Sequence, residues 1–94
     1  MTIACTGIIL EDDEEIARNV SKYIEKRTCS QIHVHNNCKD FQLAIKNKSD
    51  YTYAIIDLQL PDGSGIDTLK SLRLHHPNVK IIIITGMKNS KLLD

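Results

Sequence analysis

Three short apolar runs, each ending in acidic or hydroxyl side chains, are the strongest constraint on the fold of this 94-residue chain. The runs cover residues 6–10, 53–58 and 79–84. Runs that are apolar at consecutive positions are typical of parallel strands covered on both faces, and this holds best for residues 53–58 and 81–84. A weaker run at residues 31–35 alternates apolar and polar side chains and predicts a strand near the edge of the sheet.

Amphipathic segments separate these runs. Apolar side chains recur at helical spacing in residues 14–27, 37–46 and 64–74. Asp12 or Asp13 is expected to cap the first helix. Pro61 and Gly63 predict a turn, after which Ser64 is expected to cap the third helix. Strands that alternate with helices predict an α/β fold with a parallel sheet covered on both faces, and such sheets bind ligands beyond the carboxyl ends of their strands.

Charge and hydropathy exclude several classes of partner. The 12 basic and 12 acidic side chains cancel, so the net charge favours neither nucleic acid nor an anionic membrane surface. The apolar runs are far shorter than the roughly 20 residues that span a bilayer. The first ten residues lack the basic start of a secretory leader. We therefore expect a cytoplasmic domain that binds neither membrane nor nucleic acid.

The cysteines and histidines do not favour a second metal site. Cys5, Cys29 and Cys38 are odd in number and lack the spacing of a zinc motif, which favours reduced thiols. His33 and His35 alternate with apolar residues along a predicted strand. Packing explains these histidines better than a cluster with Cys38, because zinc sites need four well-placed donors.

Acidic side chains at two strand ends predict a metal and phosphate site. Glu11, Asp12 and Asp57 would meet at one edge of a parallel sheet, where their charges repel unless a cation lies among them. Oxygen ligands favour a hard cation, Mg²⁺ or Mn²⁺. A carboxylate beside such an ion can attack a phosphoryl group, and Thr85 could donate a hydrogen bond to one phosphoryl oxygen.

Over nearly its whole length the chain resembles the receiver domain of bacterial two-component response regulators. The matching stretches are IILEDDEEI at residues 8–16, IIDLQLPDGSG at residues 55–65 and IIIITG at residues 81–86. The resemblance implies a flavodoxin-like three-layer sandwich with a parallel sheet of strand order 2-1-3-4. It also implies a signalling domain rather than an enzyme.

The resemblance assigns roles to single residues. Asp57 matches the aspartate that receives a phosphoryl group from a sensor histidine kinase or a phosphotransfer protein. Glu11 and Asp12 match the acidic pair that holds Mg²⁺ together with Asp57 and the main-chain carbonyl of Gln59. Thr85 matches the switch hydroxyl, which moves toward the phosphoryl group on activation.

The family pattern continues with a fifth strand and a last helix that have no counterpart in residues 1–94. We therefore expect residues 1–94 to be a receiver domain that is incomplete at its carboxyl end. It would lack the lysine of the fifth strand, because Lys80, Lys88 and Lys91 lie at the wrong places. The strand from Val79 to Ile84 would be an exposed edge of isoleucines, which predicts a homodimer or a swapped oligomer through that strand.

Three other functions fit the sequence less well. A truncated receiver could dock partners through the helix at residues 14–27 without being phosphorylated, and Asp57→Asn separates this module from a phosphoacceptor. A flavodoxin-like cofactor binder would need a phosphate-binding loop rich in Ser, Thr or Gly where Glu11, Asp12 and Asp13 lie. A phosphatase with an aspartate nucleophile would need a second acid at the position of Gln59.

Overall fold

The structure is a computed structural model that describes residues 5–28, 30–47, 51–60 and 63–84. Its main sheet has four parallel strands in the order β2-β1-β3-β6. They are β1 (Cys5–Leu10), β2 (Ser30–His35), β3 (Tyr53–Ile56) and β6 (Lys80–Ile83). These are the four predicted strands, so the predicted order 2-1-3-4 is confirmed.

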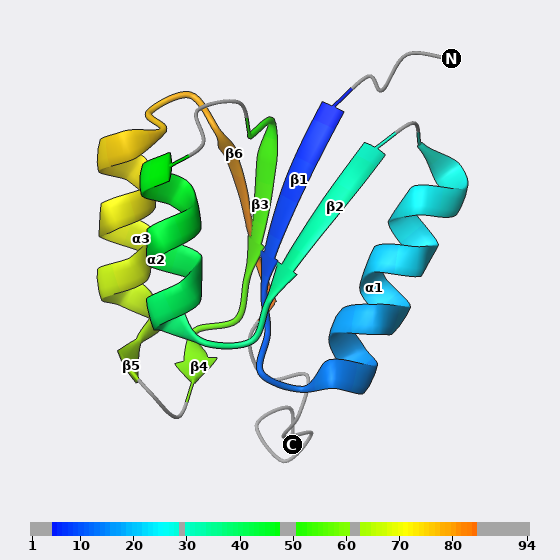
Figure 1. Ribbon diagram of the computed structural model, residues 1–94, viewed down its shortest axis with the longest axis horizontal. Coiled ribbons are helices and arrows are strands. Elements are labelled where there is room, and N and C mark those ends of the chain that lie inside the picture. The colour runs from blue at the N-terminus through cyan, green and yellow to red at the C-terminus, as the bar shows by residue number, and fades with distance from the viewer. Residues whose placement is uncertain (1–4, 29, 48–50, 61–62, 85–94) are drawn as a thin grey trace.

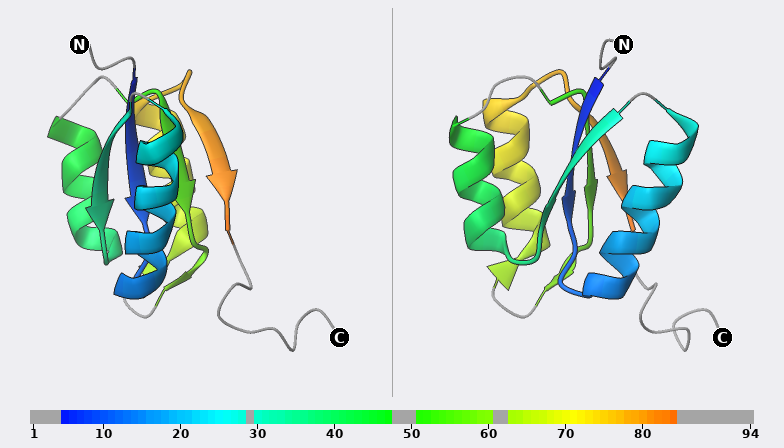
Figure 2. Two further views of the ribbon diagram at one scale, coloured as in Figure 1. Left: turned by 90° about the vertical axis from the view of Figure 1, so that its right-hand side faces the viewer. Right: turned by 45° about the vertical axis from the view of Figure 1, so that its right-hand side comes forward.

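Three helices in the described part of the chain cover the two faces of this sheet. They are α1 (Glu14–Arg27), α2 (Cys38–Asn47) and α3 (Gly65–His75). Figures 1 and 2 show α1 on one face and α2 beside α3 on the other, which confirms the flavodoxin-like three-layer arrangement. Within the described residues, no helix has the length and apolarity needed to cross a membrane.

Side-chain caps explain where the first two helices begin. Asp13, not Asp12, caps α1, because its Oδ1 accepts hydrogen bonds from the main-chain N–H groups of Glu15 at 3.0 Å and Ile16 at 3.1 Å. Asn37 precedes α2, and its Oδ1 accepts a hydrogen bond from the N–H of Asp40 at 2.8 Å. Both caps satisfy donors of the first helical turn that have no partner within the helix.

The main core lies between the sheet and the pair α2–α3. Successive side chains of a strand point to opposite faces, so alternate positions of β1 and β3 enter this core. Its fully or nearly buried members include Ile8, Leu10, Phe41, Ile45, Ala54, Ile56, Leu72 and Val79. Ile9 and Ile55 are buried on the other face, toward α1, which explains why the central strands are apolar at every position.

β6 does not share this double coverage. Ile82 is 51% exposed and Ile83 is 45% exposed. The expectation that residues 81–84 are covered on both faces is therefore wrong, and the expectation of an exposed edge is confirmed. The reason is topological: within the described part of the chain, β6 has a strand neighbour only on its β3 side.

A small hairpin that was not predicted follows β3. β4 (Gln59–Leu60) and β5 (Gly63–Ser64) pair antiparallel, while residues 61 and 62 of the predicted turn lie outside the described residues. The cap predicted at the side chain of Ser64 is also outside what the structure describes. β3 ends at Ile56, earlier than predicted, so Asp57 directly follows the strand.

Candidate functional site

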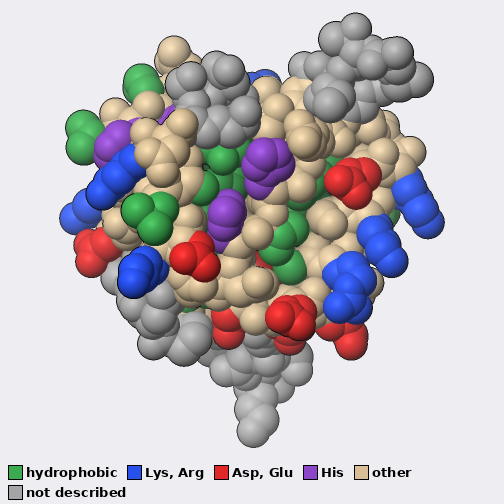
Figure 3. All heavy atoms as spheres, viewed as in Figure 1, with side chains coloured by type: hydrophobic (Ala, Val, Ile, Leu, Met, Phe, Trp, Pro, Cys, Tyr) green, Lys and Arg blue, Asp and Glu red, His purple; other side chains and the backbone are tan. Residues whose placement is uncertain are grey.

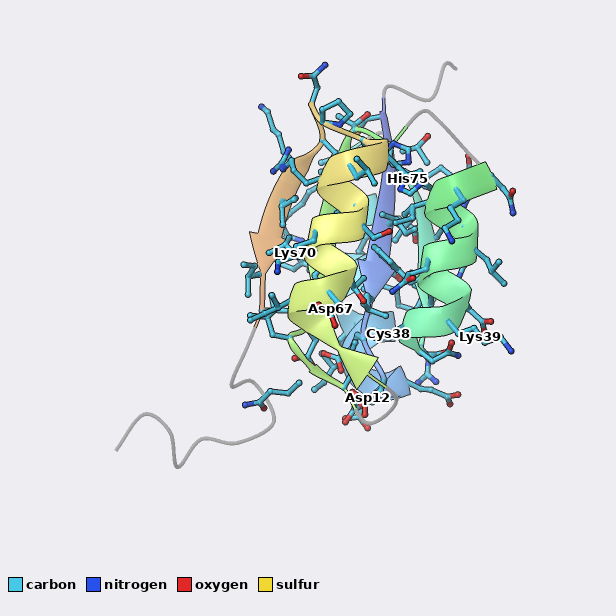
Figure 4. The ribbon with its side chains drawn as sticks, turned by 90° about the vertical axis from the view of Figure 1, so that its left-hand side faces the viewer. Asp12, Cys38, Lys39, Asp67, Lys70 and His75 are labelled. Atoms are coloured by element: carbon cyan, nitrogen blue, oxygen red, sulfur yellow. The ribbon has the colours of Figure 1, made fainter. Side chains whose placement is uncertain are left out.

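Three carboxylates converge at the carboxyl ends of β1 and β3. One side-chain oxygen from each of Glu11, Asp12 and Asp57 lies within 4.8 Å of the other two. Glu11 is 0% exposed and Asp57 is 1% exposed, whereas Asp12 is half-buried. Figure 4 places Asp12 at the end of the sheet where α2 and α3 begin, and Figure 3 shows acidic side chains gathered along that edge.

The register of the two central strands brings the acids together. Leu10 pairs with Ile56, the last residue of β3. The ladder then continues by one bond, because the N–H of Asp57 donates to the carbonyl of Leu10 at 3.0 Å. Asp57 and Glu11 each directly follow a paired residue, so they leave neighbouring strands at the same level of the sheet.

Main-chain hydrogen bonds hold Glu11 in this position. Its N–H donates to the carbonyl of His35 at 3.0 Å, and its own carbonyl accepts from the side-chain amide of Asn36 at 3.0 Å. Its Oε2 accepts from the N–H of Asp13 at 3.0 Å, which turns the carboxylate toward the start of α1. Positive charge at the start of a helix favours a carboxylate there.

Asp57 is held by the residue two positions further on. The N–H of Gln59 donates to Oδ1 of Asp57 at 2.9 Å, in the manner of an Asx turn. This bond fixes the rotation of a carboxylate that is almost entirely buried. The side chain of Gln59 is exposed, and its main chain lies in the first strand of the small hairpin.

The donor set fits a hard divalent cation. Buried carboxylates at this separation repel one another, and a bound cation or a proton is needed to relieve the repulsion. All three donors are carboxylate oxygens, the ligand type that Mg²⁺ prefers over softer metals. The residues present therefore fit the predicted Mg²⁺, which the carboxylates of Glu11, Asp12 and Asp57 could hold.

Two predicted contributions are not tested by this geometry. Thr85, the predicted switch hydroxyl, lies outside the described residues. The main-chain carbonyl of Gln59 remains a predicted ligand. Conversely, sequence reasoning overlooked Asn36, although a polar residue directly after a strand end could have marked it.

The histidines of β2 pack against aromatic rings. His33 meets the ring of Tyr51 edge-on with centroids 6.1 Å apart, and His35 meets Phe41 in the same way at 6.3 Å. Among the described residues, Glu11, Asp12 and Asp57 form the one cluster of three potential metal-binding side chains.

Comparisons with known sequences identify the family of the chain. The family model for the response regulator receiver domain matches residues 8–93. The chain is 33% identical over 79 residues to the photosynthetic apparatus regulatory protein RegA of Rhodovulum sulfidophilum, covering 84% of this chain and 42% of that protein. It is 30% identical over 79 residues to the transcriptional regulatory protein SrrA of Staphylococcus aureus, covering 84% of this chain and 32% of SrrA. The chain thus spans less than half the length of these relatives.

Solved structures show the same fold. The MaeR response regulator bound to beryllium trifluoride superposes with a TM-score of 0.76 at 28% identity, covering 94% of this chain and 76% of MaeR. A CheY-like receiver domain from Methylobacillus flagellatus gives 0.77 at 28% identity, covering 90% and 72%. Receiver domains are signalling modules that interact with histidine kinases or phosphotransfer proteins. The chain belongs to the receiver domain family of two-component response regulators.

Proposed function

We propose that this receiver domain accepts a phosphoryl group on Asp57, with Mg²⁺ held by Glu11, Asp12, Asp57 and the main-chain carbonyl of Gln59. The observation that carries the proposal is the convergence of three carboxylates within 4.8 Å, two of them buried, at the carboxyl ends of the central strands. Bringing three acids together in a largely buried site costs stability, and a cation-binding role explains that cost whereas docking through α1 does not. The docking-module alternative is therefore not favoured.

The chain's own residues supply position and charge for the transfer. A carboxylate oxygen of Asp57 forms a bond to phosphorus, while the bond between phosphorus and the donor breaks and the donor keeps its electron pair. The hydrogen bond from Gln59 fixes the attacking carboxylate, and the register of β3 with β1 places it beside Glu11. Mg²⁺, when bound, neutralises charge on the phosphoryl oxygens.

We propose a sensor histidine kinase or a phosphotransfer protein as the natural donor, on the strength of family membership. Thr85 is proposed as the switch hydroxyl, since in the chain it follows Ile84, whose N–H donates to the carbonyl of Ile56 at 2.9 Å just beyond the end of β6. Thr85→Ala should leave phosphorylation of Asp57 intact and abolish the response of the domain to it.

Intact mass spectrometry after incubation with acetyl phosphate tests the proposed chemistry. The expected result is a gain of one phosphoryl group that requires Mg²⁺ and disappears in Asp57→Asn. Asp67→Asn is the matched control, because Asp67 is an exposed acid outside the cluster. No gain in the folded wild-type domain, or an equal gain in Asp57→Asn, would overturn the proposal.

We also propose that β6 pairs with a second copy of the chain, giving a homodimer or a swapped oligomer. The support is that β6 is the outermost strand of the sheet among the described residues and that Ile82 and Ile83 are exposed, since an exposed apolar edge strand is a template for pairing. Analytical ultracentrifugation should show a dimer or larger species that Ile83→Lys converts to monomer. A compact wild-type monomer at tens of micromolar would contradict this proposal.

A further inference from the structure

The amide of Asn36 extends the sheet by one hydrogen bond beyond the end of β2. The ladder between β1 and β2 ends with Leu10 opposite His35. One further main-chain bond follows, in which the N–H of Glu11 donates to the carbonyl of His35. The carbonyl of Glu11 then meets the side-chain amide of Asn36 at 3.0 Å in place of a main-chain donor. Figure 1 shows that the chain turns away toward α2 at this point.

The hydrogen bond from Asn36 matters because it holds the main chain of Glu11, whose carboxylate belongs to the acid cluster. Its carboxylate is fully buried within a cluster whose three charges repel one another. Without a bound cation, this repulsion favours moving the loop between β1 and α1 away from Asp57. Bonds on both the N–H and the carbonyl of Glu11 resist this displacement, whereas a bond on the N–H alone would leave the peptide that links Glu11 to Asp12 able to rotate.

We infer that Asn36 is a positioning residue for the cation site, which it keeps assembled by anchoring the main chain of Glu11. The inference rests on the proposed function, since it assumes that Glu11 and Asp12 bind Mg²⁺. Groups that orient metal ligands without touching the metal commonly control its affinity. Asn36 is itself exposed, so its removal opens no cavity and its effect on folding is small.

Isothermal titration calorimetry with MgCl₂ tests the inference directly, without phosphorylation. Asn36→Ala removes the amide, and Asn36→Leu removes it while nearly keeping the shape of the side chain. We expect both variants to bind Mg²⁺ about fivefold more weakly than wild type, the equivalent of one neutral hydrogen bond. Their melting temperatures in EDTA should fall less than that of Asn37→Ala, because Asn36 gives up one hydrogen bond to Glu11 and Asn37 gives up two to Asp40.

Asn37→Ala is the matched control. Asn37 is the adjacent asparagine, but its amide and its carbonyl oxygen both bond to Asp40 at the start of α2. Losing this cap should lower the melting temperature and leave the Mg²⁺ affinity unchanged.

The outcomes distinguish a failure of the role of Asn36 from a failure of the proposed phosphoacceptor function. Wild-type affinity in both Asn36 variants would overturn the inference and leave the proposed function standing. A lower melting temperature in EDTA, comparable to that of Asn37→Ala, would also overturn it, because the role would then be structural. A folded wild-type domain that binds no Mg²⁺ would overturn the proposed function itself, and the inference with it.

Discussion

The main-chain N–H of Asp57 donates a 3.0 Å hydrogen bond to the carbonyl of Leu10, the residue directly before Glu11. This bond joins the ends of the two central strands just above the acid cluster. The register of the sheet therefore sets how far apart the main chains of Glu11 and Asp57 lie, and hydrogen bonds from the N–H groups of Asp13 and Gln59 orient the two carboxylates. Because the backbone cannot relax easily, the repulsion among the acids should be measurable as lost stability.

Replacing Asp57 by Asn should stabilise the domain when no divalent cation is present. The change removes one of three clustered charges and keeps an oxygen that can accept the hydrogen bond from Gln59. We expect a gain of about 1 kcal/mol in the free energy of unfolding, since like charges at this separation repel by about this amount or more. Urea unfolding in EDTA measures it.

Added Mg²⁺ should make the wild type more stable than Asp57→Asn. Wild type should gain stability with millimolar Mg²⁺ by mass action, and Asp57→Asn should gain much less. Equal stabilisation of both proteins would show that Asp57 is not a ligand. Asp67→Asn should respond to Mg²⁺ as wild type does.

Two glycines should respond differently to substitution by Ala. A Cβ at Gly7 would overlap the ring of Tyr53, whereas a Cβ at Gly65 would lie 2.5 Å from the Cα of Leu58. Gly65→Ala should cost about 1–3 kcal/mol of unfolding free energy, and Gly7→Ala should cost less, because the end of the Tyr53 side chain can move and the backbone of Leu58 cannot. Only the first clash is with a side chain, so Tyr53→Val should reduce the cost of Gly7→Ala. A double-mutant cycle by urea unfolding with no coupling between residues 7 and 53 would contradict this account.

Acidification should destabilise the domain through His35. Burial lowers the pKa of His35; Asp40 raises it, and His33 lowers it further. Since the pKa in the folded state lies below the ordinary value of 6.5, the unfolded chain binds more protons than the folded one around that pH. The stability that this histidine contributes is present above pH 6.5 and is lost as the pH falls through the pKa of the folded state.

The measurement is the free energy of unfolding between pH 8 and pH 5 in EDTA, for wild type and His35→Gln. His35→Gln should flatten the fall in stability, because the side chain no longer titrates. An identical slope for both proteins would assign the pH dependence to other groups. His75→Gln is the control, since His75 is an exposed histidine at the end of α3.

Loss of the imidazole of His76 should weaken the contact between α2 and the residue that follows α3. His76 is 6% exposed, and its Nε2 lies 2.8 Å from the carbonyl of Ile45, to which it must donate because a carbonyl only accepts. Phe at this position keeps the ring against Tyr51 and leaves the carbonyl without its donor. We expect a loss of about 1–3 kcal/mol in unfolding free energy. Faster amide hydrogen exchange confined to the last turn of α2 would identify the broken contact, and unchanged exchange there would contradict it.

Much of the architecture could be predicted from local patterns. The apolar runs and the amphipathic segments between them specify which residues form strands and helices, because burial on one or both faces requires those periodicities. Asp13 as the cap of α1 was one of two predicted choices, and the hydrogen bonds to Glu15 and Ile16 decide between them. The hairpin of β4 and β5 was not predicted, since two-residue strands leave no periodicity to detect.

The sequence by itself determined the order of the elements and the acids that stand at the strand ends, Glu11, Asp12 and Asp57, because each depends on residues close together in the chain. Only the tertiary structure decided how near these acids lie, since their distance follows from the register of β1 with β3. The anchoring of Glu11 by Asn36 likewise joins residues 25 positions apart. A local sequence pattern does not specify such a contact, because the contact depends on the register between strands that are distant in the chain.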